Sequence, residues 1–188
     1  MVDECDLVTC QLWLLHCGLR IHSITAYPQT YSLEARQLYI SGHNILLWLR
    51  RELERVQQSD LTSTNYIRAH AELLRAICFT ATLLIIINAV LHLENATSAT
   101  LVGSLLSLVD CIIVCAKEAA LYRPLGSLHA IWSLLIAWAA VPRQAKKTEI
   151  ALTLQRINEA GIKARTASMM VQADSMFKRL AGNKTLLE

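Results

Sequence analysis

The sequence predicts an all-α fold, on three observations. Only six Gly and three Pro occur in 188 residues, apolar residues recur three and four positions apart, and no segment alternates as a β-strand does. We expect one domain, because a chain of this length can bury a sizeable core. It is a single array of about seven or eight helices around a central apolar helix, Ala76 to Leu93. Residues 1–30 supply an N-terminal helix and connector, 33–181 the helical array and 182–188 a tail.

The first two helices are predicted over Leu7 to Ile24 and about Leu33 to Gln58. Proline at Tyr27-Pro28 disfavours continuation of the first helix. One apolar stripe runs along the second helix and charged residues occupy its opposite face, as expected of a helix half in water. The stripe consists of Leu38, Ile45, Leu46, Leu49, Leu53 and Val56, and the charged face of Arg50, Arg51, Glu52, Glu54 and Arg55.

The central helix follows Ser59 to Thr64, a cluster of residues that offers N-caps. It begins polar, contains no charged residue from Ala76 to Leu93, and ends near Glu94-Asn95. A helix that is apolar on all sides is buried in a protein core or in a bilayer. The amphipathic helices around it need a core to pack on, so we expect a soluble protein with this helix at its centre.

Four further helices complete the predicted array. The first extends from about Ser98 to Leu121, and a short apolar one from Gly126 to Val141 is stopped by Pro142. A third starts at or just before Thr148, and Gly161 separates it from the last. In the helix from Ser98 to Leu121, the side chains expected to face inward are Leu101, Leu105, Leu108, Ile112 and Cys115. In the helix after Gly161 they are Met169, Val171, Met176, Phe177 and Leu180.

The composition is apolar and nearly neutral, with 54% hydrophobic residues, 18% charged residues and a net charge of +3. Because the run from Ala76 to Leu93 could just span a bilayer, a small polytopic membrane protein is an alternative. Asp110 in the next apolar run would be costly there, so we expect no membrane partner. Basic residues are scattered among acidic ones, which predicts no direct contact with nucleic acid.

Six cysteines occur, and the start of the chain is acidic rather than basic, unlike a signal peptide. We therefore expect reduced thiols in an intracellular protein of the nucleus or cytoplasm. Cys78, Cys111 and Cys115 lie in apolar helical runs, where cysteine usually serves as a small core residue. Further Cys or His pairs at metal-ligand spacing are lacking, so neither a metal nor a cofactor is predicted.

Asp110 is the unusual acidic residue, because it stands on an otherwise apolar helix where an unpaired buried carboxylate is costly. We expect Arg123, Arg75 or a histidine to pair with it. If the helices enclose a pocket, the predicted ligand-binding residues are Asp110, His92, Tyr122 and Arg123. The six histidines form no metalloprotease or hydrolase motif, so no catalytic residue is predicted.

The order of helices and small motifs from about Leu73 to Ile162 resembles the C-terminal part of a known regulatory region. This is the middle homology region of fungal binuclear zinc-cluster (Zn2Cys6) transcription factors. In that family a Cys-containing apolar helix followed by Glu precedes a helix with an acidic residue, another helix, a basic segment and an Ile/Leu-rich helix. The corresponding segments are Leu74 to Cys78 with Leu93-Glu94, Leu101 to Ala120, Gly126 to Ala137, Pro142 to Leu152 and Gly161 to Ala164.

The DNA-binding cluster of that family uses CxxC pairs, and this sequence contains neither pair. The resemblance therefore implies a non-enzymatic regulatory or interaction domain without the DNA-reading part. Its partner would be another protein or a second copy, with a small apolar metabolite between helices as a further ligand.

The rival hypothesis is an enzyme or carrier of small apolar metabolites in a secondary-metabolite pathway. A pocket that holds Asp110, His92 and Tyr122 would favour this rival. A filled core with an exposed apolar face on the last two helices would favour the regulatory domain.

Overall fold

A computed structural model of the chain describes residues 6–59, 63–94, 98–122, 127–141, 144–158 and 163–182. These ranges form seven α-helices and one short 3-10 turn, with no strand, which confirms the all-α prediction. The elements are α1 (Leu7–Ala26), α2 (Ser32–Gln57), α3 (Ser63–Glu94), α4 (Ala99–Ala119), η1 (Ala120–Tyr122), α5 (Ser127–Ala140), α6 (Gln144–Asn158) and α7 (Lys163–Gly182). Pro142 and Gly161, which were predicted to end helices, lie outside the described residues.

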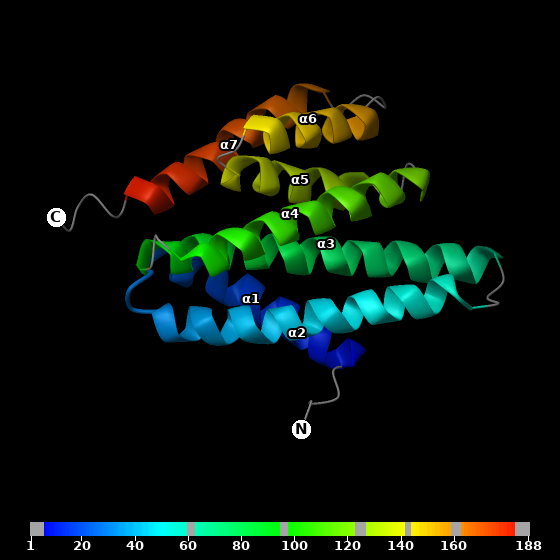
Figure 1. Cartoon of the computed structure of the whole chain (residues 1–188), viewed down its shortest axis with the longest axis horizontal. Helices are drawn as coiled ribbons and strands as arrows, with labels where there is room; N and C mark the ends of the chain where they lie inside the picture. Colours follow the sequence, from blue (N-terminus) through cyan, green and yellow to red (C-terminus); the bar gives the residue numbers. More distant parts are fainter. Residues whose placement is uncertain are drawn as a thin grey trace.

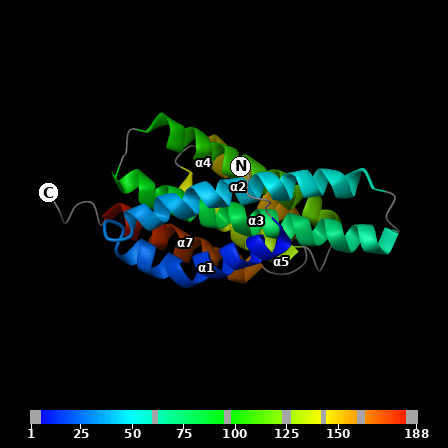
Figure 2. The ribbon, with the colours of Figure 1, turned by 90° about the horizontal axis from the view of Figure 1, so that it is seen from below.

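The helices stack in layers (Figure 1). α3, α4 and α5 occupy the middle of the molecule, with α1 and α2 on one side and α6 and α7 on the other. α3 packs against α1, α2, α4, α5 and α7, so the predicted central helix is central. From below, α1 lies along one edge of the bundle (Figure 2), in contact with α2 and α3.

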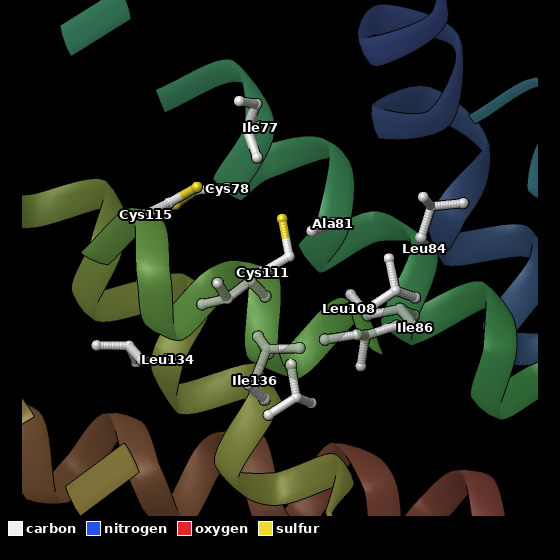
Figure 3. Close-up of a cluster of buried hydrophobic side chains, with 14 of the residues drawn as sticks. Ile77, Cys78, Ala81, Leu84, Ile86, Leu108, Cys111, Cys115, Leu134 and Ile136 are labelled. Atoms are coloured by element: carbon white, nitrogen blue, oxygen red, sulfur yellow. The ribbon is translucent and has the colours of Figure 1, made fainter. Parts of the chain in front are cut away.

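Many of the fully buried side chains lie where α3, α4 and α5 meet. Leu84, Ile85 and Ile87 of α3 are fully buried, as are Ile112 of α4 and Leu134 of α5. Figure 3 shows buried side chains of the three helices, among them Leu84, Leu108 and Leu134. Burial of each large aliphatic side chain contributes about 1.5–3 kcal/mol, so this junction supplies much of the driving force for folding.

Cysteine serves as a core residue throughout the described chain. Cys10, Cys17, Cys78, Cys111 and Cys115 are all buried and unbridged, as predicted for the last three. Burial, with the nearby Glu34 carboxylate, raises the pKa of the Cys17 thiol to about 12. The adjoining Cys115 thiol and burial likewise raise the pKa of Cys111. The Cys17 and Cys111 thiols are therefore protonated at neutral pH.

The predicted apolar stripe of α2 is buried in the structure, whereas that of α7 is wrong at one residue. In α2, Leu38, Ile45, Leu46 and Leu49 are buried, which confirms the core of that stripe. In α7 the prediction for Val171 was wrong, because this side chain is 70% exposed. Ala173 is buried and Met170 packs against the core instead. At 100° per residue, Val171 lies about half a turn away from Ala173, so it faces out.

Candidate functional site

Asp110 lies on the outside of α4, where its side chain is 54% exposed. One of its carboxylate oxygens is 2.6 Å from the Lys146 Nζ of α6. Lys146 also contacts Glu149, at 2.9 Å. The expectation of a buried carboxylate paired with Arg123, Arg75 or a histidine was therefore wrong. An apolar helix in a layered bundle still has one side in water, and Asp110 occupies that side.

The other predicted ligand-binding residues do not gather around Asp110. Tyr122 lies about three helical turns further along, where its hydroxyl is 2.9 Å from His70 Nδ1 of α3. His92 stands 22 residues beyond His70 on α3, about 33 Å away by helical rise. Arg123 lies outside the described residues. Asp110, His92 and Tyr122 therefore do not line one pocket.

His70 is the centre of a buried polar cluster that sequence reasoning did not find. Its side chain packs between the ends of α2, α3 and α4 and the residue is only 4% exposed. Gln57 Nε2 is 3.3 Å from His70 Nε2, and Tyr66 stacks on the ring with centroids 5.3 Å apart. The Glu118 carboxylate is 3.6 Å from Nε2. These partners come from three helices, so no spacing in the sequence points to them.

The His70 cluster favours a neutral imidazole. Burial lowers the pKa of His70, and the Glu118 carboxylate opposes that shift. With Gln57 donating to Nε2, Nδ1 carries the proton and donates it to the Tyr122 hydroxyl. A general base must reach a substrate atom within hydrogen-bond distance, and a ring this buried cannot do so. The cluster joins helices rather than presenting a catalytic group.

A second polar network crosses the bundle near the other end of α2. Asn88 of α3, fully buried, donates to the Tyr39 hydroxyl at 2.7 Å and to the Leu101 carbonyl at 3.1 Å. The Tyr39 hydroxyl is 2.7 Å from Ser104 Oγ, which is 3.3 Å from His43 Nε2. A serine beside a histidine is the pair that nucleophilic catalysis uses. Here the same contacts join α2, α3 and α4.

The described residues also offer no candidate metal centre. Among them, no group of three or more His, Cys, Asp or Glu side chains is placed to hold a metal ion. Cys78, Cys111 and Cys115 do meet between α3 and α4, where the thiols of Cys78 and Cys115 adjoin (Figure 3). Their burial between the two helices suits cysteine as a small core residue.

One exposed apolar surface lies on the outer side of α1. The inner side buries Cys10, Trp13, Cys17 and Ile24 against α2 and α3. Trp13 anchors it, because its indole N–H donates to Ser41 Oγ at 3.1 Å and Gly42 leaves room for the ring. The outer side carries four large apolar side chains, here named the α1 outer stripe. Its members are Val8, Leu12, Leu15 and Leu19, exposed by 59%, 61%, 61% and 71%.

The α1 outer stripe is narrow and regular. Its residues follow each other at intervals of four, three and four, the spacing of apolar positions in a coiled coil. At 100° per residue they cover an arc of about 60°, opposite the buried side. Single exposed apolar residues are common on proteins, whereas these four lie in one aligned row along the helix.

A charged cluster borders α1 where it faces the start of α2. Arg20 forms a bidentate contact with Glu34, with Nε 2.8 Å and Nη2 2.9 Å from the two carboxylate oxygens. His16 contacts the same carboxylate at 3.3 Å, and the Arg20 guanidinium lies over the Tyr31 ring. Hydrogen bonding from Arg20 lowers the pKa of Glu34 to about 2. An open groove of about 630 Å³ is lined by His16, Thr30, Tyr31, Leu33, Glu34, Gln37, Leu38 and Ser41.

Two helical segments are long and apolar enough to cross a membrane, Thr64–Leu93 and Ala99–Tyr122. Within the bundle, the protein buries 56% of the most apolar window of Thr64–Leu93. It buries 39% of the corresponding window of Ala99–Tyr122. The core helix of a soluble protein meets the same criteria of length and composition.

Comparison with known proteins adds no relative. No family model matches the chain, and no curated protein or solved structure matches it at a significant level.

Proposed function

We propose that this chain is a non-enzymatic interaction domain that binds a protein partner through helix packing. The α1 outer stripe carries the proposal, because it aligns four large apolar side chains on the outside of the bundle. An amphipathic helix commonly recognises a partner through apolar residues at intervals of three, four and seven. Burial of such side chains in a partner is the main source of binding energy in this mode.

The polar groups of the interior support an interaction domain over an enzyme. His70 and Asn88 are enclosed between helices and bonded to neighbouring side chains. Asp110 is paired with Lys146 at the surface, far along α4 from Tyr122. Each of these groups therefore has a role in holding helices together, whereas a metabolite site requires an apolar pocket with convergent polar groups.

The proposal extends to a regulatory role in the nucleus or cytoplasm. Its support is the order of helices from about Leu73 to Ile162, which resembles the regulatory region of fungal binuclear zinc-cluster factors. In such a role the chain would act on transcription through a bound protein, without contacting DNA itself.

Site-specific photo-crosslinking in cells tests the interaction function. The photoreactive residue p-benzoylphenylalanine replaces Leu15 of the α1 outer stripe in one variant. In a matched variant it replaces Leu152, a similarly exposed leucine (53%) on α6. We expect a discrete protein adduct from position 15 and none from position 152. Equal labelling from both positions, or lipid adducts alone from position 15, would contradict the proposal.

A further inference from the structure

We infer that the His70 cluster is a proton-operated switch, in which protonation of the imidazole moves its Nε2 contact from Gln57 of α2 to Glu118 of α4. The exchange loosens the end of α2 and strengthens the link between α3 and α4. Its residues are separate from the α1 outer stripe, so the switch does not depend on the proposed function. An unpartnered carboxylate oxygen, the hydrogen-bond chemistry of the ring and the weak attachment of the end of α2 support it.

One carboxylate oxygen of Glu118 is enclosed without a hydrogen-bond donor. Its Oε2 atom is shielded from solvent and has no partner among the described residues. Buried polar atoms are nearly always hydrogen-bonded, because an unpaired one is costly to enclose. His70 Nε2 lies 3.6 Å from this oxygen, but in the neutral ring Nε2 accepts from Gln57 and has no hydrogen to give. The oxygen therefore gains a donor when the imidazole takes up a proton.

Protonation changes the chemistry of one ring nitrogen and preserves that of the other. Both nitrogens of a charged imidazole are donors, so Nδ1 retains its contact with the Tyr122 hydroxyl at 2.9 Å. The new hydrogen on Nε2 faces the Gln57 amide nitrogen, which is also a donor, and the two repel each other. The Glu118 carboxylate is the better acceptor, because a charge-assisted hydrogen bond is about twice as strong as a neutral one.

The groups around the ring leave Glu118 as the charge that decides its partner. Among the described residues that contact His70, α2 contributes the neutral Gln57 amide, and α3 contributes Tyr66, stacked on the ring. The 3-10 turn contributes the Tyr122 hydroxyl and α4 the Glu118 carboxylate. The protonated ring is therefore drawn towards α4.

The switch operates below neutral pH. Burial lowers the pKa of His70 below its ordinary value of 6.5, and the Glu118 carboxylate opposes this shift. At neutral pH the ring is therefore uncharged and the end of α2 is attached. A proton binds as the pH falls through the folded-state pKa, and this uptake lowers stability because the unfolded chain binds the proton at higher pH. The contact that is given up is the one with Gln57.

The end of α2 is lightly held, so the loss of one contact has a local effect. The last buried residue of α2 is Leu49, about two helical turns before Gln57, and Leu53 between them is only partly buried. Gln57 itself is exposed, and its bond to His70 attaches the final turn to α3. Such a segment opens at a lower free energy than the core of the same helix.

Nitrogen-15 NMR and amide hydrogen exchange of the full chain test the switch. We expect the imidazole signals to show His70 with its proton on Nδ1 at neutral pH and charged in acid. Glu118→Gln should lower the pKa of His70, because it removes the charge that favours the proton. In the unmodified chain, exchange protection of residues 54–57, corrected for the intrinsic effect of pH, should fall roughly fivefold as His70 titrates, the change expected for one lost hydrogen bond.

Three substitutions isolate the contact. Gln57→Ala, at an exposed position, should give the low protection at both pH values, and His70→Gln should remove the pH dependence. His43→Gln is the matched control, because His43 is also a partly buried histidine of α2 but contacts Ser104 instead of a carboxylate. It should retain the response of residues 54–57. Circular dichroism of each variant verifies that it folds.

Two results would overturn the switch. Unchanged protection of residues 54–57 while His70 titrates would mean that the Gln57 amide turns its oxygen to the charged ring and that α2 stays attached. An unchanged pKa of His70 in Glu118→Gln would show that Glu118 does not receive the contact. The second measurement needs only the Glu118 variant, whose side chain is one-third exposed (34%), so it stands even if His70→Gln does not fold.

Discussion

α1 and α3 are both long, largely uncharged helices, yet one is enclosed and the other is half exposed. α3 carries no charge from Ala76 to Leu93 and α1 has Arg20 as its only charged residue. α3 contacts five other helices, so Leu84 to Asn88 are buried on every side. α1 packs mainly on α2 and α3, and its far side retains Leu12, Leu15 and Leu19 in solvent. Apolar composition alone therefore does not predict which helix faces are buried against other helices of the chain.

Truncation of one leucine in each helix should give the largest contrast. Leu84→Ala in α3 should lower the free energy of unfolding by about 2–5 kcal/mol, because it opens a cavity in the core. Leu12→Ala in the α1 outer stripe should change it by less than about 0.5 kcal/mol in the dilute monomer. Urea denaturation at low micromolar concentration measures both. A loss above about 2 kcal/mol for Leu12→Ala would show that α1 is covered by this chain itself.

Two glycines sharpen the same contrast. Gly42→Ala should lower the free energy of unfolding by about 1–3 kcal/mol, because the new Cβ overlaps the Trp13 ring between α1 and α2. Gly18→Ala, on the open side of α1, should raise it by up to about 1 kcal/mol through better helix propensity. Thermal unfolding of both variants at the same low protein concentration shows whether each substitution raises or lowers the stability. The same sign for both would remove the distinction between the two sides of α1.

Acid titration probes how the ends of α2, α3 and α4 are joined. Burial holds the pKa of His70 below its ordinary 6.5, so its contribution to stability is complete above that pH. This contribution is lost as the pH falls through the folded-state pKa. His70→Gln should therefore reduce the slope of the unfolding free energy against pH between pH 7 and 5. The reduction should correspond to the uptake of less than one proton on unfolding. His43, His92 and His129 have pKa values shifted the same way by burial and should preserve the remainder. An unchanged slope would mean that His70 is not the group being titrated.

The smallest effect is expected for an exposed polar contact. Asp110→Asn removes the ion pair with Lys146 and should cost less than about 1 kcal/mol of unfolding free energy, because solvent screens both groups. Chemical denaturation with Lys146→Gln and the double variant isolates the coupling between the two side chains. A coupling above about 2 kcal/mol would indicate that Asp110 is enclosed like the residues of α3.

Most helix positions could be predicted from the sequence, because the period of the apolar residues is a local property. The stripe Leu38 to Leu49 and the uncharged run after Ala76 specify the inner sides of α2 and α3 directly. Asp110 and Val171 show where this reasoning fails. Both lie in apolar stretches, and their exposure depends on which side of α4 or α7 meets another helix. Single-helix patterns do not contain that information.

The sequence by itself determined that the chain is helical, where its helices lie and that α3 must be enclosed. These follow from backbone propensity and from the cost of leaving an uncharged helix in water. Only the tertiary structure decided that His70 meets Glu118 and Tyr122, that Asp110 stays outside, and that the α1 outer stripe remains uncovered. The physical reason is that burial is shared between elements. An apolar face is covered only if the packing of the other helices brings one of them against it.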